Sequence, residues 1–190
     1  MSIELMKRVK RFRSKSSDLS FPDQIVDFES SNFSVSGVKP LHEVMDEIHS
    51  AFVWCWSVKD HLKKTLFDLS GRVDRTAFNK SFEDEIDNFE ALTICADIAN
   101  TEKHLQLNRP PRSGRLVKLD VAQSIRISPE TVSQIQRLNG CYYIVPKNNK
   151  AVELKANIVD ENGVVVMDAF QCLDKSIEAW DTIESYYANI

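Results

Sequence analysis

The sequence predicts an α+β protein: an antiparallel long-helix hairpin or bundle, followed by a small antiparallel β-sheet and a C-terminal helix. Apolar residues recur every three or four positions from Leu41 to Leu69, and again from about Thr76 to Leu107. Beyond Pro111 the chain is instead rich in Val, Ile and Tyr with partial alternation, which is typical of strands. The helical period returns near the C-terminus.

The composition is that of a globular protein, with 190 residues, 43% hydrophobic and 27% charged. We expect three regions: a basic N-terminal helix and irregular connector (1–40), a helical hairpin (41–110), and a β-rich region with a C-terminal helix (111–190). The last region is expected to pack on the hairpin as one globular unit. No apolar run is long enough to span a membrane and no signal-peptide pattern is seen, so we expect a cytoplasmic protein without a membrane partner.

The first 17 residues are basic, with six Lys or Arg against Glu4 alone, whereas the chain as a whole has a net charge of −4. A basic segment on an acidic body can bind nucleic acid or an acidic partner. The alternative is a solvated first helix, whose apolar residues recur every three positions and pack on the body. Residues 14–40 read as irregular structure with one short helix near 23–28.

The two long helices are expected to lie antiparallel because the connection at 71–75 is short. Pro40 and Gly71 bound the first helix, and Pro110 ends the second. In the β-rich region, Glu161-Asn162-Gly163 is a hairpin turn signal. Residues 129–139 read as a short helix, and the final helix is expected at 168–187.

Four polar residues cluster within little more than one turn of the second helix. Asp97, Asn100 and His104 share one face, and Lys103 lies beside His104. An imidazole can act as a general acid or base, an amide can fix its tautomer, and a lysine can neutralise a phosphate. This interpretation makes His104, Asn100, Lys103 and Asp97 a candidate catalytic group acting on RNA. Alternatively, Lys103 and His104 complement the helix dipole and Asn100 sets the register between two helices.

A basic loop follows this group directly. Arg109, Arg112 and Arg115 are interleaved with two prolines, and a stiffened loop of arginines can hold phosphates bidentately. These three residues are the candidate nucleic-acid-binding set. Solvated arginines at a junction are the alternative interpretation.

A second polar group, His42, Asp46 and His49, aligns on one face near the start of the first long helix, where His104 could approach it. Such a set could bind a divalent metal, but an exposed polar helix start also explains it, and we expect no metal. The four cysteines form no CxxC pair, and no glycine-rich phosphate loop or GxSxG motif is present. We therefore expect no cofactor.

The segment "ANTEKH" on a long helical pair resembles the HEPN superfamily over residues 41–107. Asn100 and His104 match the Asn and His of the family's short motif, whereas Ala99 stands where the family has its catalytic Arg. The resemblance implies metal-independent RNA cleavage across a homodimer, in a toxin or phage-defence setting, with Lys103 or Arg109 supplying the missing charge. The departure at Ala99 leaves a second hypothesis, a non-catalytic protein-interaction subunit with a degenerate HEPN-like bundle.

The segments "WSVKDHLKK" and "DIANTEKHL" also resemble uncharacterised bacterial proteins in which an Asn-x-x-Lys-His helix follows a Lys-Asp-containing helix. This second resemblance implies no activity.

Overall fold

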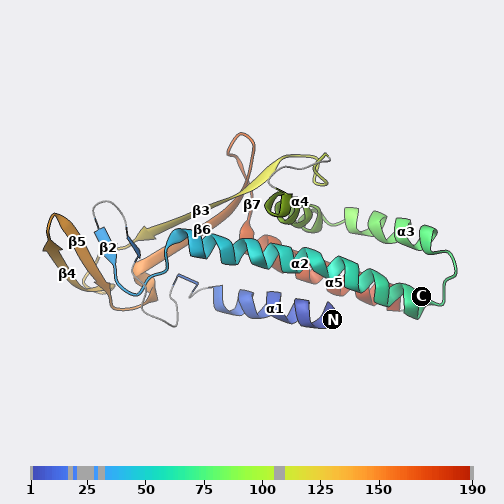
Figure 1. Ribbon diagram of the computed structural model, residues 1–190, viewed down its shortest axis with the longest axis horizontal. Coiled ribbons are helices and arrows are strands. Elements are labelled where there is room, and N and C mark those ends of the chain that lie inside the picture. The colour runs from blue at the N-terminus through green and yellow to red at the C-terminus, as the bar shows by residue number, and fades with distance from the viewer. Residues whose placement is uncertain (1, 17–18, 21–27, 30–32, 105–109, 189–190) are drawn as a thin grey trace. The chain divides into compact units, whose positions relative to one another are not determined.

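A computed structural model describes residues 2–16, 19–20, 28–29, 33–104 and 110–188. Within them the chain is α+β, as expected (Figure 1). The helices are α1 (Ser2–Lys15), α2 (Leu41–Ser70), α3 (Arg75–Asp87), α4 (Glu90–His104) and α5 (Ala169–Ala188), with a short 3-10 helix at Asn149–Ala151. The strands are β1 (Phe28–Glu29), β2 (Phe33–Val35), β3 (Val117–Ile125), β4 (Val132–Leu138), β5 (Cys141–Pro146), β6 (Val152–Asp160) and β7 (Val165–Asp168).

The chain divides into two compact units, each built from separate stretches of sequence. The helical unit comprises Met1–Arg13, His49–Leu119 and Asn157–Ile190. The strand unit comprises Ser14–Ile48 and Asp120–Ala156. Four elements, α1, α2, β3 and β6, contribute residues to both units.

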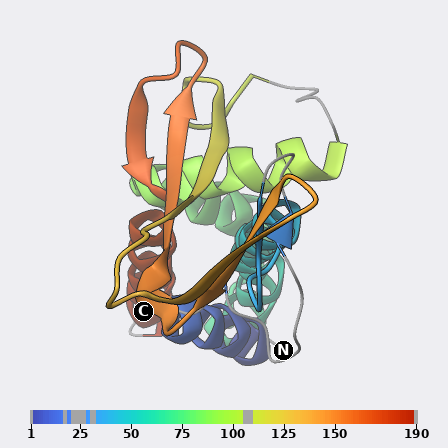
Figure 2. The same cartoon turned by 90° about the vertical axis from the view of Figure 1, so that its left-hand side faces the viewer.

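In the helical unit, α3 runs back along α2, and α4 lies across α2 and α5 (Figures 1 and 2). Gly71 makes the turn after α2 with a φ of 63°, a conformation that glycine adopts without strain. The Asp74 side chain then caps α3 by accepting the backbone N–H groups of Thr76 and Ala77. The short antiparallel connection is therefore confirmed.

The second long helix is not continuous, because α3 ends at Asp87 and α4 begins at Glu90. Asn88 N–H donates to Glu85 O at 3.2 Å, and Phe89 N–H donates to Ile86 O at 3.0 Å. These i to i−3 bonds tighten the last turn and redirect the chain. The apolar spacing continues through the break, so periodicity alone predicted one helix.

Helix α4 forms the centre of the helical unit. Every residue from Ala91 to Ala99 is buried, as expected for a helix enclosed on all sides. The Ala91 carbonyl oxygen accepts the Ser176 hydroxyl of α5 at 3.1 Å. The indole of Trp180 donates to the Cys55 carbonyl at 3.1 Å and so joins α5 to α2.

One sheet lies in the strand unit, with the order β1-β2-β5-β4. Its β2–β5 pair is parallel and its other pairs are antiparallel. Strand β2 comes from the connector that was expected to be irregular. Of the short helix expected near 23–28, residues 23–27 lie outside the described residues, and Phe28 begins strand β1. The core of this unit consists of Val35, Val38, Val132 and Ile144.

The short helix expected at 129–139 is wrong, because this segment contains strand β4 of a tight hairpin with β5. Asn139 and Gly140 both have positive φ, 50° and 85°, the signature of a two-residue type I′ turn. This Asn-Gly pair was the sequence signal that the helix interpretation overlooked.

The second sheet has the order β3-β6-β7. The hairpin expected at 161–163 is confirmed between β6 and β7, where Asp160 N–H donates to Val164 O at 3.0 Å. The final helix is confirmed as α5, and Asp168 caps it by accepting Gln171 N–H at 2.9 Å. None of the helices in the described part of the chain is both long and apolar enough to cross a bilayer.

Candidate functional site

Asp97 is almost fully buried on α4, with 2% of its surface exposed. Its Oδ1 accepts the backbone N–H of Arg112 at 2.7 Å, and its Oδ2 accepts that of Ser113 at 2.8 Å. Each carboxylate oxygen therefore holds one amide of the turn after Pro111, as a helix cap would. Asp97 therefore fixes the backbone of the segment that leads into β3.

The other members of the predicted catalytic group follow Asp97 on α4. Asn100 is half-buried, one turn further along the helix. Lys103 and His104 end α4, and their side chains lie outside the described residues, as does the whole of Arg109. The acid-base role of His104 stays a prediction.

The guanidinium of Arg112 is anchored to α3. Its Nε donates to Asp87 Oδ1 at 2.6 Å, its Nη1 to Glu83 Oε2 at 2.8 Å, and its Nη2 to the Glu83 carbonyl at 2.9 Å. It also lies 5.4 Å from the centroid of the Trp56 ring, within the range of a cation–π contact. Arg112 would have to give up these partners to bind a phosphate.

Glu83 is the acidic centre of this ion-pair network. Its Oε1 lies 2.9 Å from Lys63 Nζ and 3.5 Å from Lys59 Nζ. Partial burial by itself raises the Glu83 pKa, but hydrogen bonds from Arg112 and Lys63, with the charges of Lys59 and Lys63, lower it from 4.5 to about 2. The side chain is therefore ionised at neutral pH and holds α2, α3 and the 110–114 loop together.

Arg115, the last of the predicted nucleic-acid-binding residues, donates to Glu90 Oε1 at 2.7 Å. Both side chains are exposed, so this pair contributes little to stability. Together with the Arg112 contacts, it leaves the described arginines of the loop beside carboxylates rather than on an open basic surface.

Three of the four cysteines are buried: Cys55, Cys95 and Cys172. Within the described ranges, no cluster of three or more His, Cys, Asp or Glu residues has an arrangement that could hold a metal ion. Burial raises the pKa of Cys172 to about 12 and that of Cys95 well above its usual value. Such thiols stay protonated at neutral pH and are poor nucleophiles.

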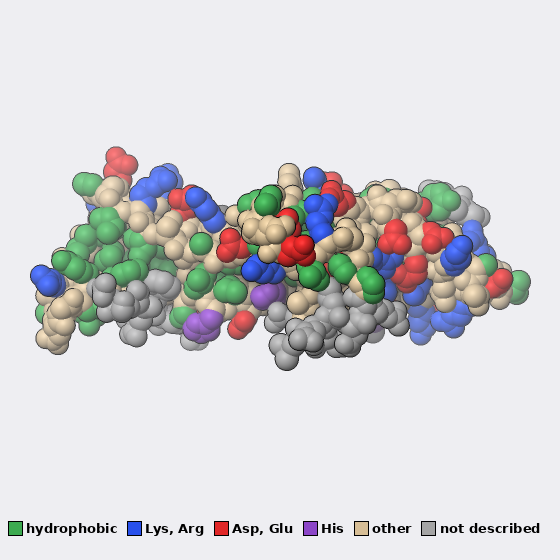
Figure 3. Space-filling view, turned by 90° about the horizontal axis from the view of Figure 1, so that it is seen from above, with side chains coloured by type: hydrophobic (Ala, Val, Ile, Leu, Met, Phe, Trp, Pro, Cys, Tyr) green, Lys and Arg blue, Asp and Glu red, His purple; other side chains and the backbone are tan. Residues whose placement is uncertain are grey.

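Sequence reasoning missed an exposed apolar surface on the β4–β5 hairpin. Figure 3 shows hydrophobic side chains gathered over these two strands. On an ordinary monomer such residues are scattered rather than grouped. Five of these side chains are more than a third exposed: Leu138, Tyr143 and Val145 on one face of the hairpin, and Ile135 and Tyr142 on the other.

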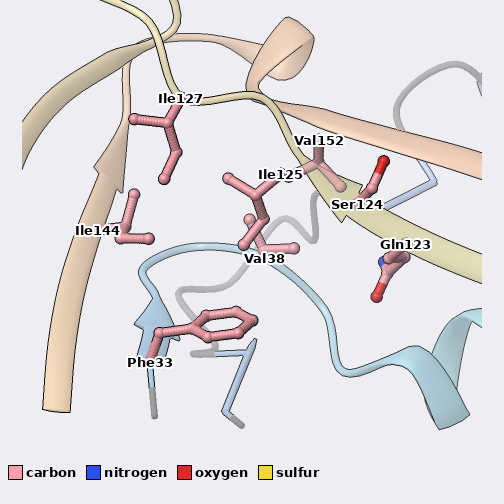
Figure 4. Close-up of a pocket in the computed structure, with 8 residues that line it drawn as sticks. All are labelled: Phe33, Val38, Gln123, Ser124, Ile125, Ile127, Ile144 and Val152. Atoms are coloured by element: carbon pink, nitrogen blue, oxygen red, sulfur yellow. The ribbon is translucent and has the colours of Figure 1, made fainter.

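A second feature of the strand unit is an apolar pocket of about 310 Å³ beside its core (Figure 4). Two polar residues of β3, Gln123 and Ser124, contribute to its wall. The remaining lining side chains are apolar: Phe33, Val38, Ile125, Ile127, Ile144 and Val152.

Comparison of the chain with protein-family models, with curated proteins and with solved structures gave no match in any of the three.

Proposed function

We propose that this protein is a non-catalytic protein-interaction subunit and that the β4–β5 hairpin is its binding surface. The observation that carries the proposal is the row of three large apolar side chains, Leu138, Tyr143 and Val145, exposed on one face of these paired strands. Aromatic and aliphatic anchors of this kind dominate the energetics of protein interfaces.

The hairpin also offers a backbone edge. Strand β4 ends the order β1-β2-β5-β4, and no other strand of the described chain pairs with its outer side. In a two-residue hairpin the residues flanking the turn, here Leu138 and Cys141, bond to each other, and the direction of bonding alternates from there. The N–H and C=O groups of Arg137 and Ile135 therefore face away from β5, where an extended segment of a partner could add a strand.

Strand β4 has one device that protects an edge, a register shift between Val132 and Gln134, but lacks two others. Its sequence, "VSQIQRL", contains neither proline nor lysine, and its single charge, Arg137, lies 5.5 Å from the Tyr142 ring centroid. An edge of this composition favours strand addition over repulsion.

The surroundings of the HEPN-like motif support a non-catalytic role. Ala99, at the position of the family's catalytic Arg, is fully buried, so an active-site cation could not stand there without rearrangement. Asp97 and Arg112, two of the predicted site residues, are engaged in fixing the 110–114 loop.

Photo-crosslinking in cells tests the binding surface. p-Benzoylphenylalanine in place of Tyr143 is expected to give a discrete adduct, and the same group in place of Leu69, an exposed residue of α2, is expected to give none. Mass spectrometry of the adduct identifies the partner. Adding Leu138→Ser should abolish the adduct while leaving the free energy of unfolding within about 0.5 kcal/mol, because Leu138 is exposed.

Equal labelling from both positions would contradict the proposed surface. A separate assay decides on catalysis: purified protein in EDTA is expected to leave RNA intact. RNA cleavage that is lost in a folded His104→Ala variant would replace this proposal with the ribonuclease hypothesis.

A further inference from the structure

The chain contains the dipeptide Asn-Gly twice, each time in the turn of a β-hairpin. Asn139-Gly140 joins β4 to β5, and Asn162-Gly163 lies between β6 and β7. An asparagine before glycine loses its side-chain amide readily, because the next backbone nitrogen can attack the side-chain carbonyl and glycine has no side chain to obstruct it. The two turns therefore place one reactive dipeptide in two settings.

The turn between β4 and β5 leaves the reacting groups unrestrained. Asn139 and Gly140 are both exposed, and the space where a Cβ of Gly140 would stand is open. Among the described residues, no group accepts the Gly140 N–H and none bonds the Asn139 side-chain amide. The attack requires the peptide between these two residues to rotate, and the rotation breaks no hydrogen bond of the attacking N–H.

The turn between β6 and β7 holds the equivalent groups in place. The Gly163 N–H donates to the Asp160 carbonyl at 3.0 Å. The Asp160 carboxylate accepts the N–H groups of Asn162 and Val164, both at 2.9 Å. At this site the attacking nitrogen is already engaged, and the residues on either side of it are fixed by the same aspartate.

We infer that Asn139 is a site of spontaneous deamidation and that Asn162 is protected from the same reaction. The nitrogen of Gly140 bonds to Cγ of Asn139, the Cγ–Nδ2 bond breaks, and the amide proton of Gly140 leaves with Nδ2 as ammonia. Water then adds across either C–N bond of the cyclic imide, which gives aspartate or isoaspartate. Water is the only co-reactant.

Isoaspartate would change the hairpin, because it adds one carbon to the backbone of the turn. Loop length fixes the register of a hairpin, so the Leu138–Cys141 pair would lose its geometry first. The N–H groups of Gln136 and Tyr143, which face each other in the next hydrogen-bonded pair, would then exchange faster. A consequent loss of partner binding rests on the proposed function, whereas the modification itself does not.

Peptide mapping by mass spectrometry tests the inference on the purified full chain kept at neutral pH. Each deamidation adds one mass unit, and labelling with an isoaspartyl methyltransferase identifies isoaspartate. In the folded protein Asn139 should react at least about fivefold faster than Asn162, the factor expected when one hydrogen bond must first open. In guanidinium chloride the two sites should react at similar rates, because the dipeptide is the same.

Two variants separate the effect of the turn from that of the dipeptide. Asn139→Gly keeps a dipeptide that suits a type I′ turn and removes the reactive amide, so most of the isoaspartate signal should disappear. Asp160→Ala removes the carboxylate that fixes the other turn and should raise the rate at Asn162 without changing the rate at Asn139. In the wild type, hydrogen exchange at Gln136 and Tyr143 should be faster in the isoaspartate fraction than in unmodified protein.

Equal rates at the two sites of the folded wild type would overturn the inference. So would a folded Asn139 that gains no mass although it reacts in guanidinium chloride. A missing Tyr143 crosslink in unmodified protein would instead overturn the proposed function and leave this inference standing, because the mass change is read without a partner.

Discussion

Each of the two units contains a polar side chain in an apolar setting, and the two side chains differ in how fully they are hydrogen-bonded. In the helical unit both oxygens of Asp97 are engaged by backbone amides. In the strand unit the Gln123 amide nitrogen is paired with Ser20, whereas its oxygen has no partner among the described residues. The sequence made Asp97 a candidate catalytic residue, but in the fold its carboxylate anchors a loop. Gln123 was not a candidate in the sequence, yet it lines a pocket.

This contrast shows that residue type can identify a candidate functional side chain, but the hydrogen-bond partners of that side chain determine its role. A carboxylate whose lone pairs are already used by the backbone has little left to offer a substrate. The Gln123 oxygen, by contrast, accepts no hydrogen bond from the described part of the chain.

The largest expected effect is that of Asp97→Ala. The change leaves the buried N–H groups of Arg112 and Ser113 without their acceptor and should lower the free energy of unfolding by about 3–4 kcal/mol. Asp97→Asn should recover only part of this, because an amide offers one acceptor and turns a donor toward the second N–H. Urea unfolding followed by circular dichroism measures both variants.

Asp60→Ala serves as the control, since Asp60 is exposed on α2. It should stay within about 0.5 kcal/mol of the wild type. A loss below about 1 kcal/mol for Asp97→Ala would mean that the loop amides find other partners and that Asp97 is free for another role.

An intermediate effect is expected at Glu83, and it depends on pH. The folded pKa, about 2, is below the unfolded value of 4.5, so the ionised side chain stabilises the fold above pH 4.5. That stability is lost as the pH falls from 4.5 to about 2. Allowing for solvent screening, the contribution is about 1–2 kcal/mol.

Glu83→Gln should therefore be less stable than the wild type at pH 7 and show a flatter decline between pH 4.5 and 2. Thermal unfolding across this range measures the difference. Asp84→Asn is the matched control, because Asp84 is exposed on the same helix with its Lys80 contact at 4.0 Å. Parallel pH profiles for wild type and Glu83→Gln would show that the ion-pair network does not stabilise α3.

The smallest effect on stability should come from Gln123→Met. The variant loses one hydrogen bond to Ser20 and also removes an unpaired buried acceptor, so the two terms oppose each other. The free energy of unfolding should stay the same or rise by up to about 1 kcal/mol. A loss of more than about 2 kcal/mol would indicate that both amide atoms are satisfied, and would remove the contrast with Asp97.

Sequence patterns predicted the long elements well and the turns unevenly. The 30-residue stripe of α2 and the amphipathic face of α5 are properties of the local sequence, so periodicity identified both. The break at Asn88 leaves the apolar spacing intact, and therefore periodicity could not show it. At Asn139-Gly140 the sequence carries a turn signal that the helix interpretation of 129–139 overlooked.

The candidate site was harder to predict because its partners are distant in sequence. Asp97 meets amides that lie 15 and 16 residues further along the chain, in a loop whose path the sequence does not specify. Arg112 meets Glu83 across 29 residues. Spacing within one helix could group Asp97 with Asn100, but it could not show that the carboxylate was already occupied.

The burial of α4 has a consequence for how the protein is made. A ribosome releases α4 before α5, although α5 supplies the hydroxyl that covers the Ala91 carbonyl and the indole that reaches α2. During that interval the nascent polypeptide carries a helix that is apolar on nearly every side and has no completed cover. Such segments are where growing chains aggregate or recruit chaperones. The helical unit can therefore be completed only after α5 has been synthesised.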